Sequence, residues 1–434
     1  MTEDRNMADI AAPSVTVISP DQRAAQRRRR YAAEARLRLY GIAAISTAIG
    51  LLGILLFTLV LGGYQAFTQT HVRVDFPISA EYVDAQDLQA SNWRAVTAEA
   101  IEDLFPAIED AATLRTAGQI LTNNTQFLVR DAVMRNPGAV GQTLTLEIPA
   151  SDPYDQLNKG VIDRDLPESR RRASDAQIEL FDQLVEQDRV SRPFNWALFF
   201  NADSRFPELA GLAGAITGSF YALLVCFVIS FPAGIAAAIY LEEFAPKNRV
   251  TDVIEVNINN LAAVPSIVFG LLGLAVFLQV FGLPRSAPLV GGLVLALMTL
   301  PTIIIVTRAS LKSIPPSIRE AALGMGASRH QVIMHHVLPL ALPGILTGTI
   351  IGLAQALGET APLLLIGMNA FITSPPGGLM EAPTALPTQI FIWADSPERG
   401  FVARTSAGIL VLLGFLIAMN AIAIFLRQRL QRTW

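Results

Sequence analysis

The sequence predicts an all-α membrane bundle of six transmembrane helices, with a soluble α+β domain inserted after the first helix. Hydrophobic residues make up 52% of the 434 residues and charged residues 16%, against about 25% charged in an average soluble protein. The apolar residues gather in long uninterrupted runs, as in proteins that span a bilayer. A polar stretch of about 144 residues follows the first run, which is enough for one soluble domain.

The N-terminal segment 1–39 is a polar arm that holds eight arginines, including the run from Arg27 to Arg30. The apolar run 40–63 follows at once, so we interpret the arm as a cytoplasmic anchor beside a membrane. Nucleic-acid binding, the other common role of a basic arm, is the less favoured interpretation. The run exceeds the core of a signal peptide and no small-residue cleavage site follows, so we expect a retained first transmembrane helix.

The next segment, 64–208, is rich in Asp, Glu, Arg, Gln and Asn and contains no run long enough to span a membrane. Strand-like stretches, His71 to Ile78 and Gln142 to Ile148, alternate with helix-like stretches, Thr97 to Asp110 and Ser174 to Arg189. This mixture of strand-like alternation and helix-like periodicity predicts one soluble α+β domain.

The remaining segment, 209–434, is expected to be a core of five membrane helices. Its apolar runs cover about 210–240, 258–281, 287–307, 338–366 and 405–426. Four prolines fall within these runs or near their ends, namely Pro232, Pro265, Pro301 and Pro362. Neighbouring helices can satisfy the carbonyls that proline frees, so we still expect these runs to span.

Lysine and arginine are distributed unevenly between the segments that six spans would place on opposite sides. One side carries seventeen, in 1–39, 241–257, 308–337 and 427–434, and the loops of the other side carry three, in 282–286 and 367–404. Lys and Arg accumulate in cytoplasmic loops. We therefore expect both termini and the 308–337 loop to be cytoplasmic, and the 64–208 domain to be extracytoplasmic.

Motifs of catalysis are absent from the sequence. It has no G-x-x-x-x-G-K-[ST] loop for ATP, no H-E-x-x-H or paired C-x-x-C, and no G-x-S-x-G elbow. His330, His335 and His336 are spaced so that they do not share a helix face. We expect no catalytic residue, no cofactor and no metal site, and a chain that moves or anchors something.

The loop from Arg319 to Ser328 predicts two short helices separated by a glycine turn. Ala321 and Ala322 add little bulk, so a partner could approach closely, and Gly326 permits the turn. Glu320 places one charge near the start of the first helix. On these physical grounds alone, an ordinary helical hairpin is an equally open interpretation.

This loop resembles the EAA loop of bacterial ABC importer permeases, whose pattern is E-A-A, three residues, G, nine residues, I-x-L-P. The matching positions are Glu320, Ala321, Ala322, Gly326, Leu338 and Pro339, while His336 stands where Ile is usual. The resemblance implies a type I ABC importer permease fold. It also implies that the 319–339 loop is a coupling helix seated in a groove of a separate ATP-binding subunit dimer.

Two further stretches are similar to the permease subunits of phosphate importers, the PstA family. They are the V-P-S-I-V-F-G string within Asn259 to Gly270 and the G-E-T-A-P string within Ala356 to Pro362. The likeness covers about 210–434, and the 64–208 insert resembles an extra domain of a subset of these permeases. It implies phosphate as substrate, a second permease subunit, an extracytoplasmic phosphate-binding protein and the bacterial inner membrane.

Glu359 lies in an apolar run, where a carboxylate costs on the order of 2.5–3.5 kcal/mol. Such residues face a bundle interior or a watery path and have a partner. We expect Glu359 and Thr360 to lie on a substrate path or gate, with Arg308 as a partner or second path residue. The alternative is a structural pair between subunits. An ionised carboxylate repels phosphate, which favours gating over direct binding.

The fifth run carries Gly344, Gly348 and Gly352, a G-x-x-x-G-x-x-x-G face that lets helix backbones approach closely. We expect a packing seam, within this chain or against a second permease. The leading hypothesis is alternating access, in which this chain forms half of a phosphate path. The alternatives are a permease for sulfate, molybdate or phosphonate, and a membrane-anchored sensor that reads a ligand through the 64–208 domain.

Overall fold

The computed structural model describes residues 20–430. The first 19 residues of the predicted basic arm, and Arg432 of the C-terminal basic cluster, lie outside the described residues. The chain divides into two compact units, Met1–Thr58 and Leu59–Trp434. Helix α1, Pro20–Gly63, forms the described part of the first unit and reaches into the second. It is longer than the predicted 40–63, because the stretch before residue 40 is rich in Arg and Ala, which are strong helix formers.

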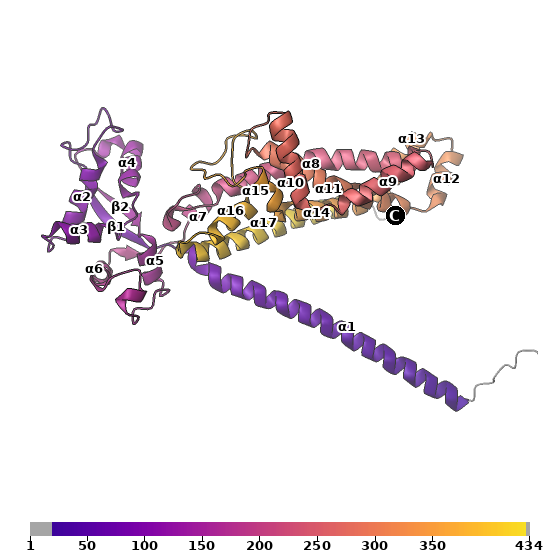
Figure 1. The fold of residues 1–434 in the computed structure, drawn as a ribbon, viewed down its shortest axis with the longest axis horizontal. Coiled ribbons are helices and arrows are strands. Elements are labelled where there is room, and N and C mark those ends of the chain that lie inside the picture. The colour runs from indigo at the N-terminus through magenta and orange to yellow at the C-terminus, as the bar shows by residue number, and fades with distance from the viewer. Residues whose placement is uncertain (1–19, 431–434) are drawn as a thin grey trace, which may run out of the picture. The chain divides into compact units, whose positions relative to one another are not determined.

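A three-stranded antiparallel sheet organises the inserted domain (Figure 1). Strand β1, His71–Pro77, is central, between β2, Thr143–Pro149, and β3, Val190–Ser191. Alternate side chains of β1 point into the core, where Val72 and Phe76 are fully buried. The two predicted strands are confirmed, with boundaries shifted by one residue.

Five helices pack with the sheet around one hydrophobic core. They are α2 Trp93–Leu104, α3 Ala111–Gly118, α4 Thr125–Arg135, α5 Asp152–Asn158 and α6 Asp175–Glu186. The predicted helical stretches correspond to α2 and α6. Helix α6 begins with a capping box in which Ser174 and Gln177 satisfy each other's backbone N–H groups. The other three are short and lack a long periodic pattern, which is why the sequence did not single them out.

Short elements connect the domain to the membrane core. The 3-10 turn η1, Tyr64–Phe67, follows α1. The others in the domain and its exit are η2 Pro137–Ala139, η3 Glu168–Arg170, α7 Ala197–Phe200 and η4 Pro207–Leu209.

The core is built on four long apolar helices of the second unit. They are α8 Ala213–Ile239, continued by the π-helical turn η5 Tyr240–Phe244, α11 Pro288–Lys312, α14 Leu338–Gly358 and α17 Gly400–Leu430. Helix α11 packs against both α8 and α14. Shorter elements complete the core: α12 Pro316–Gly324, α13 Arg329–Val332, η7 Ile333–Val337 and α16 Leu386–Ala394. Within residues 20–430, five helices are long and apolar enough to span a membrane, counting α1.

The third predicted span, 258–281, is not one straight helix. The structure has α9, Arg249–Ala262, and then α10, Ser266–Leu272, continued by the π-helical η6, Gly273–Val280. The two arms are bent by 103°. Pro265 lies at the break. It explains the break, because proline disfavours helical conformation in the residue before it and removes a backbone donor. The described part of the chain has six candidate spans only if this bent pair counts as one.

The fifth predicted span, 338–366, is also interrupted. Helix α14 ends at Gly358, and the five-residue α15, Ala361–Leu365, follows. Glu359 has an extended backbone between them, with φ −74° and ψ 125°. The carboxylate predicted to lie inside a continuous helix therefore lies at a helix break.

The glycine face of α14 packs inside this chain. A Cβ added to Gly344 would overlap Ser310, and one added to Gly348 would overlap Val306, both on α11. At Gly352 the nearest atoms, on Thr299 and Thr302, are 4.0 Å away. Gly344 and Gly348 thus permit the close approach of α14 to α11, whereas Gly352 has room for a methyl group.

Substituting alanine at two of these glycines should therefore have different effects. Gly348→Ala should lower the thermal unfolding midpoint of the purified chain, since overpacking costs roughly 1–3 kcal/mol. Gly352→Ala is the matched control and should be neutral or slightly stabilising, because Ala is the better helix former by about 1 kcal/mol. Equal losses at both positions would contradict this packing.

Candidate functional site

The loop between α11 and α14 forms the predicted helical hairpin. Helix α12 ends at a turn in which Gly326 has φ +87°, a conformation that favours glycine. Ser328 then begins α13 through a capping box with Gln331. Figure 1 shows α12 and α13 at the end of the core helices away from the inserted domain.

One side of this hairpin is buried and the other is exposed. Ala322 is 3% exposed and packs among Ile314, Val332 and neighbouring apolar residues of the core. Glu320 and Ala321 are exposed, as are Leu323 and Met325, the latter by 78%. We call these last four residues the exposed hairpin face. A gathering of exposed apolar side chains of this kind marks an interaction surface more often than chance.

Arg319 fastens α12 to the ends of two core helices. Its guanidinium donates to the Glu243 carboxylate at 2.7 Å and to the carbonyl oxygens of Leu311 and Ile314, each at 2.9 Å. The carboxylate comes from the π-helical turn that follows α8. The hairpin is therefore held by a charge-assisted, multidentate contact.

Arg308, near the C-terminal end of α11, makes a second set of charged contacts. It donates to Glu255 of α9 at 2.5 Å and to Glu242 at 3.4 Å, and Lys312 lies 3.5 Å from Glu242. The structure thus pairs Arg308 with Glu242 and Glu255. Its expected role as a partner of Glu359 or as a second path residue stays a prediction. Glu242 and Glu255 are adjacent to Arg308 in space although they are 66 and 53 residues away in sequence.

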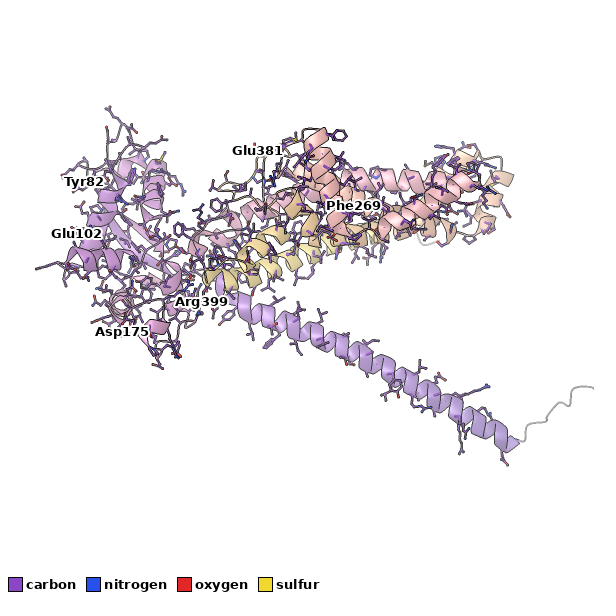
Figure 2. The ribbon with its side chains drawn as sticks, in the orientation of Figure 1. Tyr82, Glu102, Asp175, Phe269, Glu381 and Arg399 are labelled. Atoms are coloured by element: carbon purple, nitrogen blue, oxygen red, sulfur yellow. The ribbon has the colours of Figure 1, made fainter. Side chains whose placement is uncertain are left out.

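The two helix breaks described above are close in space. The short helices that follow them, α10 and α15, pack together, and Gly270 allows this because a Cβ there would lie 2.7 Å from Cα of Pro362. Phe269, labelled in Figure 2, is buried beside this contact. Glu359 and Thr360 are half-buried at the second break. The structure thus brings together the two sequence strings on which the resemblance rests.

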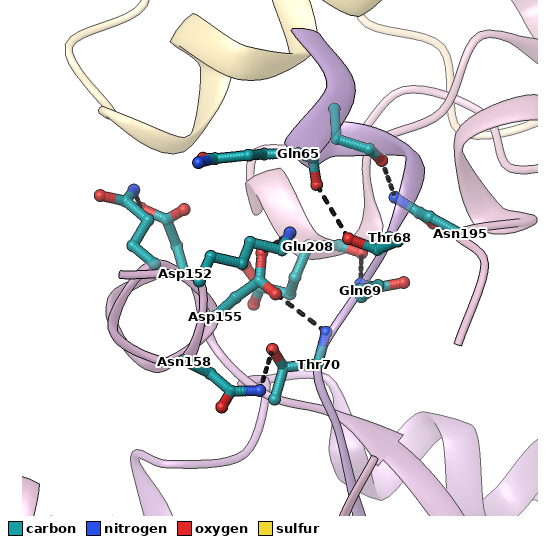
Figure 3. A network of polar contacts seen from close by, with 12 residues as sticks. Gln65, Thr68, Gln69, Thr70, Asp152, Asp155, Asn158, Asn195 and Glu208 are labelled. Atoms are coloured by element: carbon teal, nitrogen blue, oxygen red, sulfur yellow. Dashed lines mark hydrogen bonds and ion pairs between the residues drawn. The ribbon is translucent and has the colours of Figure 1, made fainter. Parts of the chain in front are cut away.

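A buried polar network joins the inserted domain to the core (Figure 3). The backbone N–H of Thr70 donates to Asp155 at 2.8 Å, and Lys159 donates to the same carboxylate at 2.5 Å. The side chain of Gln69 donates to the carbonyl of Glu208, whose carboxylate accepts from the Thr122 hydroxyl at 2.8 Å.

Arg404 of α17 lies beside this network and comes from the core. It is 6% exposed, donates to the carbonyl of Ala210, and lines a cavity of about 270 Å³ with Asp152, Asp155 and Glu208. We call Arg404 and these three carboxylates, together with Lys159, the junction.

Burial makes the charges of the junction costly. It raises the pKa of the Asp152 carboxyl and the pKa of the Glu208 carboxyl above their usual range. It also lowers the pKa of the Lys159 ammonium group. Opposite charges must offset this cost, and Arg404 is the cation that the core supplies.

Comparison with known proteins decides the family. Residues 230–433 match the family described as binding-protein-dependent transport system inner membrane component, and residues 24–168 match a domain of unknown function. The probable ABC transporter permease protein YqgI of Bacillus subtilis is 35% identical over 38% of this chain and 55% of its own length. The phosphate transport system permease protein PstA of Xylella fastidiosa is 33% identical over 52% of this chain and 78% of its own length. The chain belongs to the PstA family of permeases.

As a PstA-family permease, the chain is a multi-pass inner-membrane protein and a transmembrane subunit of an ABC importer, a transport component rather than an enzyme. It spans about half the length of YqgI. A solved structure of the MetNI methionine ABC transporter, in an inward-facing conformation, is 19% identical with a TM-score of 0.37, over 51% of this chain and 95% of that one. Within residues 20–430 of this PstA-family permease, no group of three His, Cys, Asp or Glu side chains is placed to hold a metal ion.

Sequence reasoning missed several residues of these sites. Arg404 was counted only as a loop charge, although its position at the edge of an apolar run was a signal of burial. Glu242 and Glu243 form an acidic pair directly after the second apolar run, opposite the basic end of the fourth. Asp152 and Glu208 gave no signal, because their partners come from distant parts of the chain.

The junction should depend on Arg404 in this PstA-family permease. Arg404→Ala removes a buried guanidinium from the cavity that Asp152 and Glu208 line, so we expect a loss of up to roughly 3–5 kcal/mol, seen as a lower thermal midpoint and faster proteolysis of the inserted domain. Arg172→Ala is the matched control. It breaks a 2.9 Å pair with Glu398 whose side chains are 40% and 49% exposed, and should cost no more than about 1 kcal/mol. If both variants behave alike, the junction does not hold the domain.

Proposed function

We propose that this permease imports inorganic phosphate and forms half of the translocation pathway. Its partners would be an ATP-binding subunit dimer, a second permease subunit and an extracytoplasmic phosphate-binding protein. The observation that carries the proposal is the meeting of two helix breaks, at Pro265 and at Glu359, within the two strings that resemble phosphate permeases. The likeness to the PstA protein of Xylella fastidiosa supports the choice of phosphate.

The proposed orientation puts both termini in the cytoplasm and the 64–208 domain outside. The uneven distribution of Lys and Arg supports it, since seventeen lie in the segments assigned to the cytoplasm and three in the opposite loops. Arg308, Lys312 and Arg319 gather at the hairpin end of the core. The hairpin is therefore available to a cytoplasmic ATPase.

The exposed hairpin face is the proposed contact with the ATP-binding subunit. Leu323 and Met325 supply apolar surface, and Glu320 and Ala321 complete the EAA-type element. Movement of α12 would be passed on through Arg319 to Glu243, at the end of α8. ATP-driven closure of the ATPases would thereby switch the bundle between inward-facing and outward-facing states.

The helix breaks are the proposed lining of the path. Irregular backbone at membrane depth is tolerated where it is buried in protein or lines a watery cavity. Transporters place substrate sites at such discontinuous helices. Glu359 and Thr360 would act there as gate residues, because an ionised carboxylate repels phosphate. Arg308 contacts Glu242 and Glu255, and its role as a second path residue stays a prediction.

Uptake of radiolabelled phosphate tests the function and the coupling together. Cells with this chain should accumulate phosphate and cells without it should not, and excess sulfate, molybdate or phosphonate should not compete. Gly326→Trp should reduce uptake about tenfold or more with the chain still in the membrane, since losing one central contact at an interface costs roughly 2 kcal/mol. Competition by another anion would reassign the substrate.

Cysteine crosslinking supplies the control for the same experiment. A cysteine at Ala321 should crosslink to the ATPase in membranes. A cysteine at Met380, which is 51% exposed in the loop after α15, should not. Normal uptake by Gly326→Trp would remove the coupling assignment. A crosslink from position 380 and none from position 321 would overturn the orientation.

Glu359→Gln keeps the shape of the side chain and removes its charge. If the charge gates the path, phosphate uptake should fall sharply while the yield of assembled complex stays near that of the wild type. A structural pair would give the opposite result, in which assembly fails first, because an unpaired buried cation costs roughly 3–5 kcal/mol. Uptake and complex yield are measured on the same membranes. Full uptake with full yield would withdraw Glu359 from the path.

A further inference from the structure

Exposed aromatic side chains gather where the inserted domain joins the bundle. Tyr64 is 52% exposed, Phe194 44%, Trp196 63% and Phe200 72%. The rings of Phe194 and Trp196 are 4.8 Å apart between centroids, and those of Trp196 and Phe200 are 6.0 Å apart. We call these four residues the aromatic rim. A group of large exposed apolar rings marks a surface that contacts a protein or a membrane.

The rim is held in place by the backbone around it. The backbone N–H of Asn195 donates to the carbonyl of Phe67 at 2.8 Å, and its side chain donates to the carbonyl of Ala66 at 2.9 Å. Asn195 is itself 2% exposed. Phe67 and Phe199 pack behind Phe194, with centroids 6.4 and 6.1 Å from it. The rings are thus presented outward by a fixed framework.

The rim lies at the level where membrane helices end. The first apolar span covers Arg27–Phe67, so Tyr64 belongs to its last turn. A Cβ added to Gly62 would lie 3.0 Å from Oγ of Ser406, in the first turns of α17. The end of one span and the beginning of another are therefore at the same height, next to Tyr64 of the rim.

Cationic side chains lie close to the rim. Exposed Arg192 donates to the Thr68 hydroxyl at 2.9 Å, which places its guanidinium next to η1. Exposed Arg205 lines the same hollow as Phe200 and lies over the ring of Phe371, 5.7 Å from its centroid. Aromatic rings with arginines at their edge suit the headgroup region of a bilayer, where Trp and Tyr are enriched and lipid phosphates are available.

We propose that Tyr64, Phe194, Trp196 and Phe200 insert into the headgroup region of the phospholipid leaflet on the side of the inserted domain, and so fix that domain at one height above the membrane. The continuity of the rim with the end of the first span, and the arginines beside it, favour lipid over a protein partner. The proposal rests on the chain spanning a membrane and is independent of which solute it carries.

The fluorescence of Trp196 can be used to measure whether the rim contacts lipid. Among the tryptophans within residues 20–430, Trp93 and Trp393 are buried, at 6% and 2% exposed, and Trp196 is exposed. The full chain would be placed in nanodiscs of phosphatidylethanolamine and phosphatidylglycerol that carry a quencher at the headgroup, at a shallow acyl position or at the acyl end. Subtracting the fluorescence of Trp196→Phe isolates the signal of Trp196, and also removes that of Trp434.

The isolated signal should be quenched most by the headgroup and shallow labels and least by the acyl-end label. Phe200→Trp in the Trp196→Phe chain moves the fluorescent side chain along the rim. The three lipid labels should quench it in the same order, which guards against a misfolded single variant. Quenching by aqueous iodide without quenching by any lipid label would mean that the rim faces water. Insensitivity to both would mean that protein covers it. Each of these last two results overturns the proposal.

Discussion

Backbone hydrogen bonding in a water-free layer is the constraint on which the core depends. Every N–H and C=O within the bilayer must find a partner inside the protein, so the spans are helices and a broken helix needs protein or water around it. This chain breaks its helices at Pro265 and at Glu359. Packing of α10 on α15, permitted by Gly270, brings the two breaks close together. Two interruptions of the long apolar helices therefore meet, and this is where we propose that a path through the bundle runs.

Charged contacts connect that region to the far end of the bundle. Arg319 ties the hairpin to Glu243, and Arg308 ties α11 to Glu255 of α9, the helix that ends directly before the first break. Each contact links elements that are separate in sequence, and each is partly shielded from water, where charge-assisted hydrogen bonds are strongest. A displacement at the hairpin would therefore be shared by α8, α9 and α11 rather than absorbed by a flexible loop.

One contact within the chain and one proposed contact with lipid would together hold the inserted domain. Inside, the junction places Arg404 among three carboxylates, whose charges are costly when buried and need a cation. Outside, the aromatic rim offers rings suited to a membrane surface. Together these contacts would make the domain move as one body with α17 and the end of the first span, instead of rotating about the segments that connect it to the core.

Local patterns in the sequence determined where the apolar runs lie, the strands β1 and β2, and the hairpin with its turn at Gly326, because hydrophobic period and glycine conformation act over a few residues. They did not show that two of those runs, 258–281 and 338–366, form broken helices. The family likewise followed from contiguous strings. The tertiary structure alone brought Arg308 to Glu242 and Glu255, and placed Gly348 but not Gly352 in tight contact. It alone brought Arg404 to Ala210, 194 residues away. Partners of this kind are set by how helices pack in three dimensions, and no pattern along the chain carries that information.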